Sequence, residues 1–582
     1  MSKIPQGEGR SLVDLGPGAG SAVERVKLES QGLRGRLAEE LAEETSRFSD
    51  AQIQLIKFHG IYQQEDRDAR QARKAAGVEK LYNFMVRSRI PGGALSAPQY
   101  LVQDDLAGRY ANGSLRITTR QGLQLHGVLK GDLQAAIAGI NEALLSTLAA
   151  CGDVNRNVMA CPAPVASRAH AQVQAIAHTI AMHLAPRSTA YHEIWVDGEQ
   201  VKTVEAPETP VNEPIYGPTY LPRKFKIGVA FPGDNCIDIY TQDIGMVAEL
   251  EGETLTGFTL LVGGGMGMTH GKTETYPRLA TPLCSIAVDE VLEVVETIVG
   301  IQRDFGDRTN RKHARMKYLV EERGITWFRA ELERRLGRFV RAPRPVQWLK
   351  ADDHLGWHQQ ADGRWFLGLW VENGRIKDTP RLRLRAGLRQ VVETFKPGIR
   401  LTAQQNILLT DIEENDRTAV EALLTEFGII SQPAALGGVH RHALSCPALP
   451  TCGLALADSE RALPALVRRL EDDLAALGLG GEQLSVRMTG CPNGCARPYM
   501  GDIGLVGKTK DVYNLYVGGD WANTRLNTLY ASSVRLEALP DTIRPLLELW
   551  RDEREPEESF GDFTERWGVE QLRIQVEGRY GT

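Results

Sequence analysis

The chain repeats itself at a long period, and this repeat constrains its fold more than any other feature. Residues 116–127, RITTRQGLQLHG, align with residues 400–411, RLTAQQNILLTD, at an offset of 284. Residues 155–164, NRNVMACPAP, align with residues 440–450, HRHALSCPALP, at an offset of 285. Self-similarity at so long a period indicates duplication of a large unit and not a solenoid of short repeats.

A third pair of segments extends the repeat and indicates the fold class. Residues 226–265, KIGVAFPGDN…DIGMVA…LLVGGG, are similar to residues 486–520, VRMTGCPNGC…DIGLVG…LYVGGD. The segments FMVRSRI and LRITTR alternate as strands do, whereas GDLQAAIAGINEALLSTLAA has helical periodicity. Strands that alternate with helices predict an α/β (α+β) fold. We therefore expect two halves, each with a ferredoxin-like unit followed by a larger α/β unit.

The length of the chain sets the expected number of hydrophobic cores. Single cores stop growing at roughly 250–300 residues, so a chain of 582 residues is expected to contain more than one. Together with the repeat, the length predicts five segments, which are an N-terminal extension (1–50), a first ferredoxin-like half-domain (51–150), a first larger α/β domain (151–345), a second ferredoxin-like half-domain (346–435) and a second larger α/β domain (436–582).

Composition and the N-terminal sequence indicate a cytoplasmic protein. The chain is 42% hydrophobic and 24% charged, and no apolar run approaches the ~18–20 residues that a membrane span needs. The N-terminus has neither the apolar segment of a signal peptide nor an arginine-rich amphipathic stretch. The net charge of −6 argues against non-specific binding of nucleic acid. We expect neither a membrane nor a nucleic acid as a partner.

Four of the eight cysteines cluster near the C-terminal end of the chain. Five residues separate Cys446 from Cys452, and three separate Cys491 from Cys495. In a large chain without an export signal, clustered cysteines indicate ligands of a metal or cluster rather than disulfides. Zinc sites usually have two to four residues between paired ligands, whereas iron–sulfur clusters take four thiolates at varied spacings. The spacing favours a cluster and leaves zinc and four buried structural thiols as alternatives.

The residues between these cysteines suit loops around a bulky cofactor. Pro447, Pro450 and Pro492 oppose helix formation, and Gly490 and Gly494 allow close approach of the backbone. Backbone N–H groups in such loops can point at the sulfur atoms of a cluster.

The motif C-x5-C … C-x3-C, within CPALPTC and TGCPNGCARP, resembles that of the sulfite and nitrite reductases that carry siroheme coupled to a [4Fe-4S] cluster. The resemblance runs from LIKFHGIYQQEDRD at 55–68 to SFGDFT at 559–564 and includes the duplication. It implies that the two ferredoxin-like units and the two larger units surround a central cofactor. It also implies that Cys495 bridges the cluster to the siroheme iron and that the cluster has four ligands, Cys446, Cys452, Cys491 and Cys495.

Basic residues are expected to bind the anionic substrate. Arg87 and Arg89 are two apart and therefore predicted on one strand face. YLPRKFKIGVAF places two lysines at the start of an apolar strand, where charges need partners unless they are solvated. The resemblance implies an anion pocket formed by Arg87, Arg156, Lys224 and Lys226, which would hold sulfite and donate protons. Arg89 is expected to pair with a cofactor carboxylate.

A row of polar residues is predicted to bind siroheme. RITTRQGLQLH has five polar side chains at even-numbered positions, which predicts a single strand face. Siroheme carries eight carboxylates, and arginine binds carboxylates through two parallel hydrogen bonds. The alternative is a solvated strand face. The residues expected to bind siroheme are Arg116, Thr118, Arg120, Gln124 and His126, together with Cys495.

The resemblance implies an assimilatory enzyme that reduces sulfite to sulfide with six electrons. The segment Arg223-Lys224-Phe225-Lys226 is similar to that of the sulfite enzymes, whereas the nitrite enzymes tend to have asparagine in place of the last lysine. Nitrite remains the alternative substrate. A non-catalytic iron–sulfur electron carrier or sensor is the alternative class, which the basic pocket disfavours because a carrier needs no substrate site. Cys161, which the repeat matches with Cys446, has no assigned role.

The electron donor is expected to be a separate protein. LLVGGGMGMTHG is glycine-rich but is not a G-x-G-x-x-G fingerprint, and no flavin or NADPH module is visible. The sequence is closest to the ferredoxin-dependent type, so ferredoxin is the expected donor. The alternative donor is the flavoprotein subunit of an NADPH-dependent enzyme.

Overall fold

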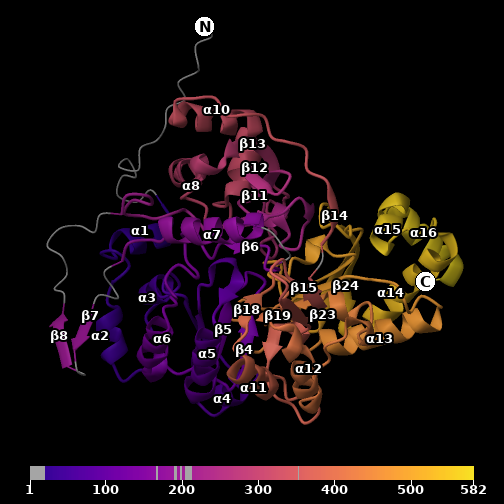
Figure 1. Cartoon of the computed structure of the whole chain (residues 1–582), viewed down its shortest axis with the longest axis horizontal. Coiled ribbons are helices and arrows are strands. Elements are labelled where there is room, and N and C mark those ends of the chain that lie inside the picture. Colours follow the sequence, from indigo (N-terminus) through magenta and orange to yellow (C-terminus); the bar gives the residue numbers. More distant parts are fainter. Residues whose placement is uncertain are drawn as a thin grey trace, which may run out of the picture.

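Four five-stranded β-sheets organise the computed structural model, two for each half of the repeat (Figure 1). The structure describes residues 20–164, 168–188, 193–196, 199–203, 213–351 and 353–581. Helices cover the sheets, and the predicted duplicated α/β (α+β) fold is confirmed by the identical strand order of the two halves.

The two ferredoxin-like sheets exchange their last strands. Strand β17 (Arg375–Ile376) pairs with β4 of the first half, and β3 (Ala94–Leu95) pairs with β18 of the second half. Neither half-sheet is complete without the other half of the chain. The first sheet has the order β1 (Ile61–Glu65), β2 (Tyr82–Arg87), β5 (Leu123–Val128), β4 (Leu115–Ile117), β17, and the second has the order β15 (Gly356–Gln359), β16 (Trp365–Leu369), β19 (Ile407–Ile412), β18 (Gly398–Leu401), β3.

Amphipathic helices cover these two sheets. In α11 (Leu384–Phe395), Leu384, Leu388, Val391 and Val392 are buried, which is the spacing of one helix face. Helix α5 (Ala97–Tyr110) begins with a reciprocal capping box, in which Ser96 and Gln99 each bind the backbone N–H of the other. The helices on and beside this pair of sheets are α1 (Ala22–Leu28), α2 (Leu37–Ala42), α3 (Asp50–Leu55), α4 (Arg70–Ala75), α5 (Ala97–Tyr110), α6 (Leu133–Glu142) and α12 (Arg417–Glu426).

The two larger sheets have the same topology. In each, the first three strands run parallel and the last two are antiparallel. The first sheet contains β6 (Met159–Ala160), β9 (Ile227–Ala230), β11 (Ile244–Glu251), β12 (Thr254–Val262) and β13 (Thr281–Ala287), and the second contains β20 (Ala443–Ser445), β21 (Val486–Thr489), β22 (Ile503–Thr509), β23 (Val512–Val517) and β24 (Thr528–Arg535).

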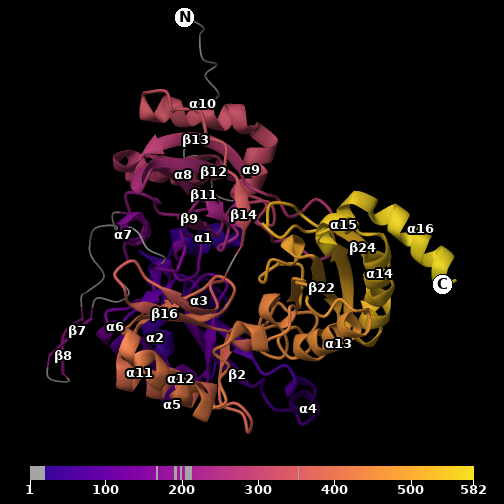
Figure 2. The ribbon, with the colours of Figure 1, turned by 45° about the vertical axis from the view of Figure 1, so that its right-hand side comes forward.

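Helices pack on both larger sheets, and two short strand pairs lie outside them (Figure 2). The first larger unit has α7 (Arg168–His183), α8 (Val291–Phe305), α9 (Met316–Arg323) and α10 (Ile325–Leu336), and the second has α13 (Leu463–Ala476), α14 (Leu539–Glu553), α15 (Phe560–Trp567) and α16 (Val569–Tyr580). The short pairs are β7 (Glu193–Val196) with β8 (Glu199–Thr203), and β10 (Gly233–Asp234) with β14 (Trp348–Lys350).

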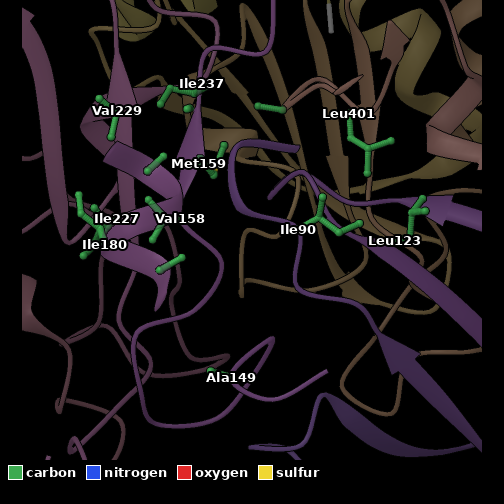
Figure 3. Packing of buried hydrophobic residues seen from close by; sticks show 14 of the residues in the cluster. Ile90, Leu123, Ala149, Val158, Met159, Ile180, Ile227, Val229, Ile237 and Leu401 are labelled. Atoms are coloured by element: carbon green, nitrogen blue, oxygen red, sulfur yellow. The ribbon is translucent and has the colours of Figure 1, made fainter. Parts of the chain in front are cut away.

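The hydrophobic core is divided unequally. One continuous core joins both ferredoxin-like sheets to the first larger unit, and a second core fills the second larger unit. Figure 3 shows part of the first core. Ile90 and Leu123 come from the first ferredoxin-like unit, Met159 and Val229 from the first larger unit, and Leu401 from the second half, and all five belong to one cluster. The two loops of β20 and β21 that carry the clustered cysteines therefore lie on the separately packed unit.

A buried carboxylate, Asp153, ties the N-terminal helix α1 to this core. It accepts hydrogen bonds from Arg311 at 2.6 and 3.0 Å and lies 3.6 Å from the buried Nζ of Lys27. Burial alone would raise the pKa of Asp153, but Arg311 and Lys27 outweigh burial and lower it. Its folded pKa is thus below the unfolded value of about 3.9. The stabilisation is fully present above that value and is lost as the pH falls below it.

Asp153→Asn is expected to lower the free energy of unfolding by about 3 kcal/mol at pH 7, because it leaves Arg311 without its carboxylate partner and the buried Lys27 with Glu24 alone. The difference from the unmodified protein should shrink as the pH falls below about 3.9, because the unfolded chain then takes up a proton that the folded Asp153 does not. Thermal unfolding midpoints at pH 7 and at about pH 3 test this, with Asp472→Asn on the exposed side of α13 as the control. Equal midpoints of the unmodified protein and Asp153→Asn at pH 7 would contradict the assignment.

Candidate functional site

Two loops at one edge of a parallel strand pair bring the four predicted cysteine ligands together. Strands β20 and β21 run parallel, so their carboxyl ends meet at the same edge of the sheet. Cys446 follows β20 directly, and Cys491 follows β21 after one residue. The charges of the four thiols influence one another in all six pairwise combinations.

Hydrogen-bond donors point at these sulfur atoms. The N–H of Gly490 lies 3.3 Å from Cys446 Sγ, and the Asn493 side-chain amide lies 3.4 Å from Cys491 Sγ. The N–H groups of Leu454 and Ala455 donate to Cys452. Such donors stabilise the thiolates that hold an iron–sulfur cluster.

The protonation of these thiols also fits a bound cation. Burial raises the pKa of Cys446, and it raises that of Cys491 to about 12, with the neighbouring thiols adding to both effects. Thiols in this environment become thiolates when a metal compensates their charge. Within the described ranges, no three or more His, Cys, Asp or Glu side chains are arranged to hold a single metal ion. The four interacting thiols match the number of thiolates that an iron–sulfur cluster takes.

The predicted single strand face of residues 116–126 is wrong, because these residues form a hairpin. Strand β4 ends at Ile117 and β5 begins at Leu123. The turn is closed by Thr118, whose Oγ1 accepts from the N–H groups of Arg120 at 3.2 Å and Gly122 at 3.1 Å. Simple alternation does not reveal a turn, so the pattern was extended through it.

Three of the five polar residues, Arg116, Gln124 and His126, still share one face of the sheet, and the His126 ring lies against the side-chain amide of Gln124. Arg116 and Gln124 are cross-strand partners, and Gln124 pairs in turn with Arg87 of β2. In its favoured amide orientation, the Gln124 oxygen accepts from Arg87 Nε at 3.2 Å. Arg116 is bound by protein groups, Glu460 at 3.1 Å and the carbonyl of Ser445 at 3.0 Å.

His126 and Arg120 lie in different environments. Burial, reinforced by neighbouring arginines, holds the pKa of His126 well below its usual value, so this imidazole is neutral. Arg120 donates to Gln242 Oε1 at 2.7 Å. The residue before it, Thr119, donates to the carbonyl of Cys495 at 2.9 Å. The hairpin turn thus connects the cysteine loop to the basic residues.

The structure brings the four predicted anion-binding residues into one basic cluster. Tyr62 interacts with both Arg87 and Arg156, and Arg156 in turn influences Lys224. Lys224 and Lys226 influence each other, and Lys224 also feels the charge of Cys495. The cluster therefore lies beside the thiol that is predicted to bridge to siroheme.

The side chains of the two lysines in this cluster differ from those of the two arginines in their contacts with the residues that the structure describes. Arg87 donates to Cys151 Sγ at 2.8 Å, and Arg156 donates to the carbonyl of Gly152 at 3.2 Å. Neither the Lys224 nor the Lys226 side chain has a hydrogen bond or ion pair to any residue that the structure describes, although both residues are half-buried. Burial, followed by neighbouring cations, lowers the pKa of both lysines. An oxyanion would supply the missing partner.

The cluster is surrounded by further basic residues, of which the sequence analysis named only Arg223, and that without a role in the site. Burial lowers the pKa of Arg223 to about 10, and Arg311 contributes. Arg315 binds Asp243 with 2.9 and 3.0 Å contacts. Lys317 donates to the carbonyl of Gly267 at 2.8 Å, in the glycine-rich loop that contacts the cysteine loop through Met268 N and Pro492 O. The basic run RKHARMK at 311–317 was the available signal.

The prediction that Arg87 and Arg89 share a strand face is also wrong. Strand β2 ends at Arg87, so the alternation stops there. Arg89 is buried and donates to the carbonyl of Ala181 in α7 at 3.2 Å.

The duplicated fold and the four converging thiols define an iron–sulfur oxidoreductase. Comparison with known families agrees. The nitrite and sulphite reductase 4Fe-4S domain matches residues 175–339 and 437–582, and the nitrite/sulfite reductase ferredoxin-like half domain matches residues 78–143 and 358–427. The chain belongs to the nitrite and sulphite reductase family. The predicted cofactors, siroheme and a [4Fe-4S] cluster, are confirmed by this membership.

Curated relatives are similar over almost their whole length. One is the sulfite reductase [NADPH] hemoprotein beta-component of Myxococcus xanthus (strain DK1622), which is 50% identical over 549 residues, 94% of this chain and 96% of that protein. The protein of the same name from Paenibacillus sp. (strain JDR-2) is 47% identical over 553 residues, 95% of this chain and 96% of that protein.

A solved structure shares the fold. The Mycobacterium tuberculosis NirA protein superposes with a TM-score of 0.76 at 22% identity, over 94% of this chain and 97% of that one. Among the residues described, no helix combines the length and apolar character that crossing a bilayer requires.

Proposed function

We propose that the chain is the hemoprotein component of an assimilatory sulfite reductase that reduces sulfite to sulfide with six electrons. The observation that carries this proposal is a pair of lysines beside the cysteine loop, Lys224 and Lys226, whose side chains have no hydrogen bond or ion pair to the part of the chain that the structure describes. When bound, siroheme and the [4Fe-4S] cluster would supply the electrons. Cys446, Cys452, Cys491 and Cys495 are proposed to hold the cluster, with Cys495 shared with siroheme.

The basic cluster would bind the substrate and deliver protons. Reduction of sulfite to sulfide converts three oxygens into water and consumes protons at each oxygen. Lys224 and Lys226 have a lowered pKa, because burial disfavours their charged form. An amine with a lowered pKa donates its proton more readily near neutral pH. The guanidinium groups of Arg87 and Arg156 would hold the anion while oxygen leaves.

The remaining polar residues have different proposed roles. Arg120 and Gln124 are proposed to face the siroheme carboxylates, directly or through Arg87. Thr118 would act by closing the hairpin turn that positions Arg120. Arg116 and His126 would support the same sheet from within, since Arg116 already binds Glu460 and His126 is buried and neutral.

The proposed electron donor is a separate NADPH-dependent flavoprotein. Both relatives described above are named as the beta-component of an NADPH enzyme, which implies a second component. These names favour the flavoprotein over ferredoxin, the donor first expected from the sequence. Sulfite is the proposed substrate and nitrite the second candidate, because Lys226 stands where the nitrite enzymes tend to have asparagine.

The donor is tested by turnover with two purified electron donors. We expect sulfide release with NADPH and the flavoprotein component to be at least about 10-fold faster than with reduced ferredoxin at equal donor concentration. A chemical reductant serves as the control, because it bypasses docking and should support turnover in both samples. Faster turnover with ferredoxin would contradict the donor assignment while leaving sulfite reduction in place.

A further inference from the structure

The first half of the chain carries two thiols where the second half carries its cluster ligands. Cys161 follows β6 and its N–H donates to Val229 O at 3.3 Å, just as Cys446 follows β20 and donates to Met488 O at 3.3 Å. Cys236 lies six residues past the end of β9 at Ala230, and Cys495 lies six residues past the end of β21 at Thr489. The duplication has thus left a thiol pair in the first half.

This pair is in contact with two imidazoles. The Cys161 side chain forms hydrogen bonds with Cys236, His170 and His354. His354 lies 3.2 Å from the carboxylate of Asp234, and His170 stacks on Phe231 at a ring-centroid distance of 3.6 Å. The Cys161 and Cys236 side chains are buried, with 3% and 1% of their surface exposed.

Ordinary core packing does not account for these contacts. Cys284 is a cysteine packed in strand β13, where burial raises the pKa of its thiol to about 12. At Cys161 the hydrogen bonds from Cys236 and the imidazoles outweigh burial and lower the pKa of the thiol, whereas contact with Cys161 raises that of Cys236. The contacts therefore favour the thiolate form at Cys161 and the thiol form at Cys236. A single metal ion is not indicated, since no group of three or more potential ligands in the described ranges suits one.

We propose that Cys161 and Cys236 form a reversible disulfide when the protein meets a hydroperoxide. Cys161 passes its proton to an adjacent imidazole, and the thiolate attacks the peroxide oxygen. The O–O bond breaks, Cys161 becomes a sulfenic acid, and water or an alcohol leaves after protonation. Cys236 then attacks the Cys161 sulfur, the S–O bond breaks, and its thiol proton leaves with the hydroxide as water. Two electrons pass from the thiol pair to the peroxide, and a small dithiol returns them.

The position of the pair connects it to the cysteine loop of the other half. Two residues beyond Cys236, Asp238 binds Arg487 at 2.8 Å and also pairs with Arg497. Arg497 is two residues past Cys495. A disulfide at Cys236 would fix this segment to β6 and so hold the contacts next to the proposed cluster loop.

The test exposes the holoprotein to increasing concentrations of hydrogen peroxide and then analyses its peptides by mass spectrometry. Free thiols are alkylated under denaturing conditions before digestion. We expect a cross-linked pair of peptides containing Cys161 and Cys236, lighter by two hydrogens and separated again by dithiothreitol. Cys284 should stay alkylated. The readout is a mass and does not depend on sulfite turnover, so it is independent of the proposed function.

Three variants sharpen the test. In Cys236→Ser, Cys161 should accumulate sulfinic acid, because no second thiol resolves the sulfenic acid. His354→Asn should slow disulfide formation at least about threefold, since the rate follows the thiolate fraction of the attacking thiol. Cys284→Ser should form the cross-link like the unmodified protein. If Met182, which is 54% exposed, is oxidised while Cys161 and Cys236 remain alkylated, the proposal is wrong. Over-oxidation of Cys161 without a cross-link in the unmodified protein would also overturn it.

Discussion

Replacing Cys446 by serine is expected to remove the iron–sulfur cluster and to lower sulfite turnover more than about 100-fold. Changing a residue that only hydrogen-bonds to a metal ligand already lowers metal affinity or activity about 10–100-fold. Replacing a ligand itself should therefore lower both by more. Cys446 is buried at the end of β20, where its Sγ accepts from the N–H of Gly490. A serine hydroxyl there would be a much poorer iron ligand than a thiolate.

The matched control is Cys284→Ser, which changes a buried thiol on β13, away from the cysteine loops. Iron and acid-labile sulfide per chain should fall in Cys446→Ser and stay unchanged in Cys284→Ser. Full iron content and turnover in Cys446→Ser would remove this residue from the ligand set. Thermal unfolding of both variants separates loss of the cluster from general misfolding.

Lys226→Asn is expected to reduce kcat/KM for sulfite by about 100-fold. The reduction of kcat/KM for nitrite should be smaller, at most about 10-fold. Removing one hydrogen-bond donor that stabilises developing charge lowers kcat by about 100–1,000-fold in comparable sites. The Lys226 side chain has no hydrogen bond or ion pair among the described residues, so a bound anion could pair with it and favour its charged form. Sulfite can carry two negative charges and nitrite carries one, so sulfite should depend more on a second lysine.

This comparison uses one enzyme preparation, a chemical reductant and both substrates. Lys510→Asn, on the exposed turn between β22 and β23, is the control and should leave both values within about twofold. Equal losses for sulfite and nitrite in Lys226→Asn would count against the assignment of this lysine to substrate choice. Unchanged turnover of both would remove it from the pocket.

The repeat predicted most of the architecture because duplication acts on whole units. Aligning residues 226–265 with 486–520 anticipated two sheets of one topology, and β9, β11 and β12 correspond to β21, β22 and β23 as expected. The exchange of β3 and β17 between the halves was not predicted. Each exchanged strand has two residues, which is too short for an alternating pattern to be visible.

The cysteines of the site were more readily predicted than its polar residues. Paired cysteines with few residues between them must lie close together, whichever fold carries them. The partners of Arg116 and Arg89 depend on tertiary contacts, with Glu460 and Ala181, that are distant in sequence. Arg315 and Lys317 lie at the start of a helix far from the other basic residues in the chain. Local periodicity carries no information about such contacts.

The most direct test of the proposed function is the visible spectrum of the purified protein, measured with its iron and acid-labile sulfide content and followed by sulfite turnover in the same sample. We expect a siroheme spectrum, about four cluster irons with one haem iron per chain, and release of sulfide. A colourless protein, or one with zinc in place of iron, would contradict the account and return the four cysteines to a structural role.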